Sequence, residues 1–456
     1  MEEFDVIVIG AGSGLDVASA YASQGKNVAV IEPGRMGGTC LNRGCIPSKM
    51  LIHHADIAQE IRGSEKFHIN SELGEIEYEE IITEVNEEVR KDSENIEKGL
   101  EKSENHTLYR TEAEFIDNNT LDVSDGEKDE DEIKGDKIIV AAGTRPFVPP
   151  IDGIEDVDYL TSKEALKLKE KPKDMIVIGG GYISNELAHF FDAMGIEVKI
   201  LERGENMLKY EDREISEKYT ELAQDRFNVE LGYEASKVSQ EGKRIKVVAE
   251  SDEGEKEFEA DELFFATGRV PNTDNLKVEN TNIETGERGF IEVNEYLQTT
   301  VDHIYALGDI IGQHPFKHAA NKEANAALIN SFAGNQKEID YTAMPHAVFS
   351  SPQIAGVGKT EGELEEEDTE YRKATYDYKE TGMGMALKEE NGFVKVLASE
   401  DGEILGCHII GPHASQQIHE VLVSMKSGSG NVSDIQDTIH IHPALNEVVQ
   451  RAFNQL

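Results

Sequence analysis

The segment FDVIVIGAGSGL at residues 4–15 decides the fold of this chain. The β-branched residues 6–9 predict a short buried strand, and the glycines after them predict a tight turn into a helix. A second strand, residues 27–31, ends at Glu32. In such a unit the helix N-terminus can bind a pyrophosphate, and the acidic residue can accept hydrogen bonds from ribose hydroxyls. The segment therefore predicts a dinucleotide site, although Leu15 stands where a third Gly or Ala is usual.

The same unit occurs a second time in the middle of the chain. A strand over residues 174–178 leads into three glycines, a helix, and a strand that ends at Glu202. The separation between Gly179 and Glu202 nearly equals that between Gly10 and Glu32. One glycine fingerprint alone is a weak signal, but two with matched acidic residues indicate an internal duplication. Two dinucleotide sites in one chain suggest that electrons pass between two cofactors.

Two similar strands mark where the chain crosses between these units. Residues 137–143 and 262–268 each form an apolar run that ends on a glycine. Such runs predict strands that close on a turn, with boundaries near Pro150 and Pro271. The acidic stretch 125–136 predicts a charged turn between elements.

A second informative segment is GGTCLNRGCIPSK at residues 37–49, which holds two of the three cysteines. A bond between Cys40 and Cys45 would close a very short loop and so would add little stability, which favours a redox role. If Cys45 begins a helix, as Pro47 in the first turn suggests, the helix dipole favours a thiolate there. A metal site is not expected, because further ligands are missing and Cys407 lies in an apolar strand pattern that predicts a core residue.

The composition and net charge limit the kinds of protein that this chain can be. The chain has 456 residues, with 90 Asp and Glu against 45 Lys and Arg, and a net charge of -45. Self-repulsion of this size destabilises a compact state unless salt screens it, because the Debye length falls to about 3 Å at 1 M. We therefore expect a protein of a salt-accumulating halophile. No cationic cluster suits nucleic acid, and neither a leader nor a membrane-length apolar run is evident, so we expect a cytoplasmic protein with no membrane partner.

Together with the ending HPALNE at residues 442–447, these segments resemble the class I FAD-dependent pyridine nucleotide-disulfide oxidoreductases. That family includes dihydrolipoamide dehydrogenase, glutathione reductase and mycothione reductase. The resemblance covers essentially the whole chain. It implies an α/β fold with two Rossmann-like dinucleotide-binding domains and an α+β C-terminal dimerisation domain. The expected ranges are 1–149 for the first part of the FAD-binding domain, 150–270 for the NAD(P)-binding domain, 271–340 for the return segment of the FAD-binding domain, and 341–456 for the dimerisation domain.

The resemblance also implies cofactor-binding residues. Those expected at FAD are Gly10, Gly12, Gly14, Glu32, Thr39, Lys49, Gly143 and Asp309. Those expected at NAD(H) or NADP(H) are Gly179, Gly181, Tyr182, Glu202, Arg203, Lys209 and Gly268. Tyr182 stands where the family often has a gate over the flavin. Lys49 and Glu186 match a pair beside the flavin and nicotinamide, where a cation stabilises the reduced ring.

The implied mechanism passes hydride from NAD(P)H to FAD and then electrons to a Cys40-Cys45 disulfide, which exchanges with a small disulfide substrate. Cys40 would be the interchange thiol and Cys45 the thiol beside the flavin. The thiols need a base near neutral pH, and His442, oriented by Glu447, suits that role. In the family this pair comes from the partner subunit. We therefore expect a homodimer with the catalytic residues Cys40, Cys45, His442, Glu447, Lys49 and Glu186.

The sequence alone does not decide which nucleotide or which substrate the protein uses. Glu202 favours NADH, whereas Arg203 and Lys209 fall where NADPH-using members carry cations for the 2'-phosphate. The segment CIPSK favours dihydrolipoamide dehydrogenase, with lipoyl groups of 2-oxoacid dehydrogenase complexes as candidate partners. The ending HPALNEVV and Leu15 favour reductases of mycothione or bis-gamma-glutamylcystine. Other readings are an electron-carrying flavoprotein subunit and a transhydrogenase or NADH oxidase relative, against which the cysteine pair and the His-Glu pair argue.

Overall fold

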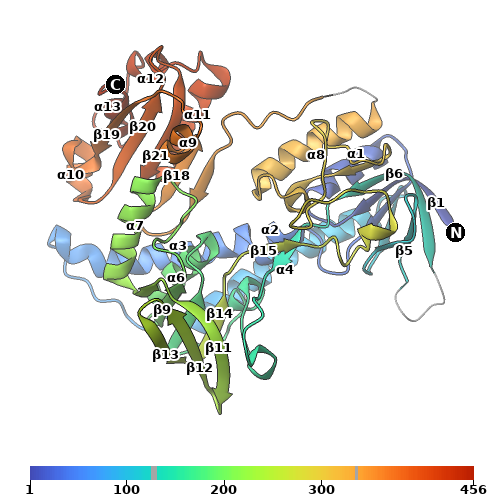
Figure 1. The fold of residues 1–456 in the computed structure, drawn as a ribbon, viewed down its shortest axis with the longest axis horizontal. Coiled ribbons are helices and arrows are strands. Elements are labelled where there is room, and N and C mark those ends of the chain that lie inside the picture. Colours follow the sequence, from blue (N-terminus) through green and yellow to red (C-terminus); the bar gives the residue numbers. More distant parts are fainter. Residues whose placement is uncertain (125–130, 334–336) are drawn as a thin grey trace. The chain divides into compact units, whose positions relative to one another are not determined.

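A computed structural model describes residues 1–124, 131–333 and 337–456 (Figure 1). The chain divides into two compact units, each built from separate segments. The first unit comprises Met1–Ser48, Glu80–Phe147 and Gly268–Tyr341. The second comprises Lys49–Glu79, Val148–Thr267 and Thr342–Leu456. Each unit holds one of the two glycine segments.

The first unit is built on a seven-stranded sheet in the order β3-β2-β1-β6-β5-β4, with β16 also paired to β6. The pairs among β1, β2, β3, β6 and β16 are parallel, and those among β4, β5 and β6 are antiparallel. Its strands are β1 Glu2–Ile9, β2 Val28–Ile31, β3 His106–Tyr109, β4 Glu114–Phe115, β5 Thr120–Asp122, β6 Glu132–Val140 and β16 Ile304–Ala306, and β7 Thr144–Pro146 and β15 Arg269–Pro271 form a separate pair. The apolar residues of β1 are fully buried, as expected for a parallel strand covered on both faces.

Helices α1 (Gly14–Ser23) and α8 (Lys317–Phe332) pack beside one another in this unit (Figure 1). The Tyr21 ring meets Phe332 edge to face at 4.9 Å between centroids, and its hydroxyl donates to Ser331 Oγ at 3.1 Å. The other helical segments of the first unit are α2 Gly38–Arg43, η3 Val278–Asn280 and η4 Gly308–Ile311. Helices α3 (Cys45–Arg62) and α4 (Tyr78–Glu101) each continue from one unit into the other.

The second unit contains a four-stranded parallel sheet in the order β10-β9-β8-β14, which carries the second glycine segment. An antiparallel sheet β11-β12-β13 lies in the same unit. The strands are β8 Asp174–Ile178, β9 Glu197–Glu202, β10 Asn228–Leu231, β11 Glu234–Glu241, β12 Arg244–Ser251, β13 Gly254–Ala260 and β14 Glu262–Phe265. The helical segments are η1 Gly63–Phe67, η2 Ile154–Asp156, α5 Ser162–Ala165, α6 Tyr182–Ala193 and α7 Arg213–Arg226.

The C-terminal part of the second unit is an antiparallel five-stranded sheet in the order β17-β18-β21-β20-β19. Helix α11 (Ala414–Ser427) packs on β18 and β21, and α13 (Glu447–Phe453) packs on β19 and β20. The strands are β17 His346–Val348, β18 Ile354–Gly358, β19 Arg372–Asp377, β20 Phe393–Ala398 and β21 Ile404–Ile410, with α9 Glu361–Glu366, η5 Tyr378–Glu380, α10 Gly382–Leu387 and α12 Ser433–Gln436 between them. Cys407 is fully buried within β21, so the prediction of a core residue is confirmed.

These elements confirm the predicted fold class, and one local prediction is wrong. A charged turn was expected at residues 125–136. Residues 125–130 lie outside the described residues, and from Glu132 onward the chain forms strand β6 rather than a turn. Its charged side chains alternate with buried Ile133 and Gly135 in a strand paired with β1 and β5. The turn was expected from charge alone, and the period-two burial of the intervening residues outweighs that signal. Among the described residues, no helix has both the length and the apolar character needed to cross a bilayer.

Candidate functional site

The first glycine segment forms a tight turn between β1 and α1. Gly10 has φ 99°, and a Cβ there would lie 2.3 Å from the Ala141 carbonyl oxygen, so only glycine fits. A Cβ on Gly14 would lie 2.8 Å from Val8 Cγ1 and 2.9 Å from Ala141 Cβ. Gly14 therefore provides the close contact of helix and strand that the third glycine of the fingerprint usually provides, which accounts for Leu15.

Glu32 closes this site from the end of β2. Its Oε2 accepts from the Ala11 N–H at 3.0 Å, and its Oε1 accepts from the Gly34 N–H at 2.9 Å. The carboxylate is thus fixed beside the glycine turn, where a ribose of a bound dinucleotide is expected. Gly12 has only Gly38 Cα near a built Cβ, at 3.9 Å, which leaves room for a phosphate to approach. These residues fit the ADP part of FAD.

The second glycine segment repeats this geometry. Gly179 has φ 105°, and a Cβ there would lie 2.6 Å from the Ala266 carbonyl oxygen. Glu202 Oε2 accepts from the Gly180 N–H at 2.5 Å, and Oε1 accepts from the Gly204 N–H at 2.7 Å. A Cβ on Gly181 would meet no atom within 4 Å. The two loops are therefore equivalent in their glycine turn, their fixed carboxylate and their open glycine, and the second one fits a nicotinamide dinucleotide.

Arg203 and Lys209, the two cations predicted near the 2'-position, point elsewhere in this structure. Arg203 Nη1 lies 3.3 Å from Glu234 in an exposed ion pair. Lys209 Nζ lies 5.1 Å from the ring centroid of Tyr210. The carboxylate of Glu202 is thus in contact with the glycine turn, whereas Arg203 contacts Glu234 and Lys209 contacts the Tyr210 ring.

The cysteine segment packs directly on the first glycine turn. Gly38 has φ 64°, and a Cβ there would lie 2.6 Å from Gly12 Cα, so the two loops touch through their backbones. The side-chain amide of Asn42 donates to the carbonyl oxygens of Met36 at 2.9 Å and Gly38 at 3.1 Å, which fixes the turn. Thr39 and Cys40 follow within α2.

Cys45 is the first residue of α3, as the sequence predicts. The structure holds Cys40 and Cys45 as thiols. The hydrogen bond between their side chains, together with burial, raises the pKa of the Cys40 thiol well above its usual range, and the charge of Lys317 acts in the opposite direction. A reduced Cys40 is therefore protonated and needs a base before it can attack a disulfide, because the thiolate is the nucleophile.

Lys49 and Glu186 form an ion pair, with 2.5 Å between Nζ and Oε2. Lys49 lies four residues after Cys45 in α3, and Glu186 lies in α6. Glu186 Oε1 also accepts from the Phe349 N–H at 3.0 Å, and Lys49 Nζ lies 4.6 Å from the Phe349 ring centroid. Tyr182 and Glu186 are separated by one turn of α6, so they share a face of that helix.

Asp309 lies in η4 and accepts a hydrogen bond from Thr144 Oγ1 at 3.2 Å. Arg269 Nε donates to the same Thr144 hydroxyl at 2.7 Å. Burial lowers the pKa of Arg269, and the charge of Asp309 acts in the opposite direction. Gly143 and Gly268, the predicted crossing glycines, flank this group: Gly143 precedes Thr144, and Gly268 precedes Arg269. Sequence reasoning missed Thr144 and Arg269, although their positions directly after the two glycines were a usable signal.

Sequence reasoning also missed Lys317. This residue begins α8, and its Nζ donates to Ser13 Oγ at 2.7 Å. Ser13 in turn donates to Asn321 Oδ1 at 3.1 Å. A cation therefore lies at the first glycine turn, where it fits an anionic phosphate. The only sequence signal was a lysine at the start of a helix, which is too common to single out.

His442 and Glu447 form the predicted pair in the second unit. His442 Nδ1 lies 2.9 Å from Glu447 Oε1 and 3.1 Å from Oε2, and the Ala444 N–H donates to Oε2 at 3.3 Å. The hydrogen bond from His442 lowers the pKa of Glu447. The imidazole is 75% exposed, whereas the carboxylate is 8% exposed. The pair thus presents an oriented imidazole to solvent.

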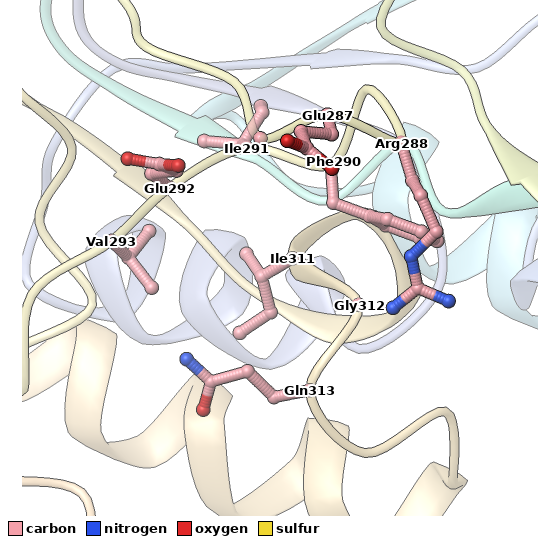
Figure 2. A pocket seen from close by; sticks show the side chains of 10 residues that line it. Glu287, Arg288, Phe290, Ile291, Glu292, Val293, Ile311, Gly312 and Gln313 are labelled. Carbon is pink, nitrogen blue, oxygen red and sulfur yellow. The ribbon is translucent and has the colours of Figure 1, made fainter.

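A separate pocket of about 540 Å³ opens in the first unit (Figure 2). Polar and apolar side chains both line it, and none of the residues predicted to bind substrate or cofactor is among them. Its walls are Gly286, Glu287, Arg288, Phe290, Ile291, Glu292, Val293, Ile311, Gly312 and Gln313. Within the described parts of the chain, no three His, Cys, Asp or Glu side chains gather into a group that could hold a metal ion.

Comparison with known proteins identifies the family. The family model described as pyridine nucleotide-disulphide oxidoreductase matches residues 4–326, and the model of its dimerisation domain matches residues 344–453. A dihydrolipoyl dehydrogenase of Staphylococcus aureus is 35% identical over 99% of this chain and 96% of its own length. A mycothione reductase of Mycobacterium tuberculosis is 33% identical over 99% of each chain.

A solved structure agrees with these matches. The HOCl-induced flavoprotein disulfide reductase RclA of Escherichia coli, in a Cu(II) complex, superposes with a TM-score of 0.88 at 28% identity, covering 100% of both chains. The family uses FAD and a nicotinamide nucleotide, and both glycine loops of this chain fit such groups. The chain therefore belongs to the pyridine nucleotide-disulphide oxidoreductases and is a flavoprotein disulfide oxidoreductase.

Proposed function

We propose that this protein is an NAD-linked dihydrolipoyl dehydrogenase that acts as a homodimer. The observation that carries the choice of NAD is Glu202, whose carboxylate is fixed by the N–H groups of Gly180 and Gly204. A carboxylate in that position accepts from a ribose 2'-hydroxyl and repels a 2'-phosphate. The identity of 35% with a dihydrolipoyl dehydrogenase supports the substrate.

In this proposal each side chain of the site has a separate role in disulfide exchange. FAD, when bound, would carry two electrons between the cysteine pair and the nicotinamide, in the proposed reaction from the dithiol formed on exchange with dihydrolipoamide to NAD+. Cys40 exchanges with the substrate, and Cys45 faces the cofactor. His442 takes the thiol proton, which Cys40 retains because its pKa is raised. Glu447 orients the imidazole, and Lys49, held by Glu186, places a cation beside the reduced ring.

Further residues complete the proposed cofactor sites. Gly10, Gly12, Gly14 and Glu32 hold the ADP part of FAD, while Thr39, Lys49, Gly143 and Asp309 border the rest of it. The nicotinamide nucleotide takes Gly179, Gly181, Tyr182, Glu202 and Gly268. The domain ranges 1–149, 150–270, 271–340 and 341–456 belong to the same proposal, as does a partnership with lipoyl groups of 2-oxoacid dehydrogenase complexes in the cytoplasm of a halophile.

A second candidate function is the NADPH-dependent reduction of a small thiol disulfide such as mycothione or bis-gamma-glutamylcystine. It is favoured by the identity of 33% with a mycothione reductase. Arg203 and Lys209 would have to leave Glu234 and the Tyr210 ring and turn toward the phosphate. In concentrated salt the repulsion between Glu202 and that phosphate is partly screened.

Steady-state turnover separates the two candidates. The purified holoenzyme is assayed in about 2 M KCl, where charge is screened, with NAD+ and dihydrolipoamide, and with NADH or NADPH and each small disulfide. Fast oxidation of dihydrolipoamide by NAD+ is the expected result. Turnover only with NADPH and a small disulfide would replace the first candidate by the second.

Hybrid dimers test whether His442 acts in the partner's site. Cys40→Ser and His442→Ala are each expected to be inactive as homodimers. After the two variants are unfolded together and refolded, about a quarter of wild-type turnover should return, because half of the dimers then hold one complete site of two. A mixture that stays inactive, while wild type treated in the same way recovers, would mean that each site is complete within one chain.

A further inference from the structure

A buried carboxylate joins two elements of the second unit. Glu211 lies between β9 and α7, and its side chain has no exposed surface. Tyr182 OH donates to its Oε1, and His346 Nε2 lies 2.9 Å from its Oε2. The rings of Tyr182 and His346 stack with centroids 6.4 Å apart and 23° between their planes. Glu211 therefore links the start of α6 to the start of β17.

Charge fixes the direction of these hydrogen bonds. Burial would raise the pKa of Glu211, but the hydrogen bond and charge of His346 and the hydrogen bond from Tyr182 hold it below its usual value. Burial and the neighbouring Glu211 charge raise the pKa of Tyr182. The phenol is thus neutral and the carboxylate is charged. Because a carboxylate only accepts, Tyr182 and His346 Nε2 are the donors.

The loop that carries Glu211 has a separate anchor. The neighbouring Asp212 is buried and accepts from Lys395 Nζ at 2.7 Å, and Lys395 also donates to Glu361 Oε2 at 2.6 Å. This ion cluster fixes the loop to β20 of the C-terminal sheet. The loop therefore has a strong attachment without Glu211, so the bond from Tyr182 can be removed without releasing the loop.

Tyr182 occupies a functional position. It is the first residue of α6, directly after the loop Gly179 to Gly181, and it shares a face of the helix with Glu186. The segment at β17 contacts both residues of this face: the His346 ring stacks on Tyr182, and the Phe349 N–H donates to Glu186. The buried carboxylate of Glu211 therefore fixes the position of the Tyr182 ring, which borders the nucleotide loop.

We propose that Glu211 and His346 form a clamp that holds the Tyr182 ring against its own unit and so keeps the nicotinamide end of the nucleotide site open. The proposal rests on the proposed function, in which Tyr182 borders the nicotinamide. Glu211 and His346 are positioning residues, because they act on the nucleotide only through Tyr182. Without the clamp the ring lies over the glycine loop and competes with the nicotinamide, but not with the ADP-ribose part.

The test compares binding of a whole nucleotide with that of its nicotinamide-free fragment. Holoenzyme with Tyr182→Phe, Glu211→Met or both is titrated calorimetrically with NAD+ and with ADP-ribose, or with the 2'-phosphorylated pair if the wild type binds that form. Tyr210→Phe is the matched control, because that hydroxyl belongs to a 78% exposed neighbour of Glu211. The Kd for NAD+ should rise about tenfold in both single variants, while the Kd for ADP-ribose stays within about twofold.

Two further readouts identify a positioning role. In Glu211→Met the KM for NAD+ with dihydrolipoamide should rise with the Kd while kcat changes by less than about twofold, which is the pattern of lost binding rather than lost chemistry. The double variant should match the single variants, because both remove the same contact. The control should resemble the wild type throughout.

Several outcomes would overturn the clamp. Unchanged NAD+ affinity in both single variants would mean that Tyr182 does not control the nicotinamide end. A parallel loss of NAD+ and ADP-ribose affinity would indicate a general structural role for Glu211. A wild-type enzyme that does not turn over dihydrolipoamide would contradict the proposed function but not the clamp. The Kd values for NAD+ and ADP-ribose are measured without a disulfide or dithiol substrate.

Discussion

The pair His442 and Glu447 is the residue-scale feature on which disulfide exchange depends most. Because Glu447 is charged and accepts from Nδ1, the imidazole carries its proton there and keeps Nε2 as a base. The resemblance of the ending HPALNE to the family predicted this contact. Their exposure differs, since the imidazole is open and the carboxylate is covered, and that difference is a property of the fold at the start of α13.

We expect Glu447→Gln to lower turnover of the disulfide substrate by about 10- to 100-fold, since the imidazole loses its orientation and its charged partner. The measurement is kcat against pH with dihydrolipoamide. Oxidation of NADH by ferricyanide serves as the control, because a one-electron acceptor can take electrons without thiol exchange. Equal losses in both reactions would contradict the assigned role.

At the scale of elements, the two strand–turn–helix units were predictable and the contacts between distant segments were not. Residues 4–15 and the second glycine segment predicted strands, turns and helices because their glycines and β-branched runs act locally. The pairs of Arg269 with Thr144 and of Glu211 with His346 join residues 125 and 135 positions apart. No local pattern encodes such contacts, since they arise only when the sheets are assembled.

The open glycines of the two loops should separate cofactor binding from folding. A Cβ at Gly12 or at Gly181 meets no atom closer than 3.9 Å, so alanine fits the protein itself. We expect Gly12→Ala to weaken FAD binding and Gly181→Ala to weaken nucleotide binding, each by about tenfold or more, because a methyl group blocks the approach of phosphate to the backbone.

Release of FAD on dilution and calorimetric titration of the nucleotide measure these two effects. Gly10→Ala is the contrasting variant, since its Cβ would lie 2.3 Å from Ala141 O and the fold itself should suffer. If Gly12→Ala and Gly181→Ala destabilise the protein while retaining full cofactor affinity, the loops are structural turns and not binding sites.

The ion cluster of Lys395, Asp212 and Glu361 should govern stability in acid. Burial would raise the pKa of Glu361, but hydrogen bonds from Lys395, Lys373 and Tyr371 lower it to about 2. A carboxyl whose pKa is lowered on folding stabilises the protein above its unfolded pKa of 4.5, and that contribution is lost as the pH falls toward 2.

Lys395→Met should therefore cost about 3–5 kcal/mol at neutral pH, because buried Asp212 loses its cation and Glu361 keeps only Lys373, and should move acid unfolding to higher pH. Denaturant unfolding between pH 3 and 7, a range set by the carboxyl titration, measures both effects. The control is Lys379→Met, whose ion pair with Asp377 is exposed and should contribute little to stability. Similar losses in both variants would argue against the cluster.

At the scale of the whole molecule, charge is the dominant property. A net charge of -45 means that the chain folds against its own repulsion, which salt relieves. The charge was available from composition, and the family was available from motifs, which are local. The substrate was not, since related enzymes share the residues around the disulfide.

We expect the thermal midpoint to rise by about 10 °C or more between 0.1 and 2 M KCl, because the Debye length falls several-fold. Differential scanning calorimetry measures it, and NaCl at equal ionic strength should give a similar rise if screening is the cause. A midpoint that is unchanged or falls with salt would contradict a halophilic protein.

The measurement that tests the central claim most directly is the redox state of the cysteines after reduction by nucleotide. Oxidised holoenzyme is mixed anaerobically with one equivalent of NADH or NADPH, the thiols are alkylated, and labelled peptides are quantified by mass spectrometry. One hydride and a proton convert one disulfide into two thiols, so label should appear at Cys40 and Cys45 together and remain unchanged at Cys407. Reduction of the flavin without any new label at Cys40 and Cys45 would contradict the account.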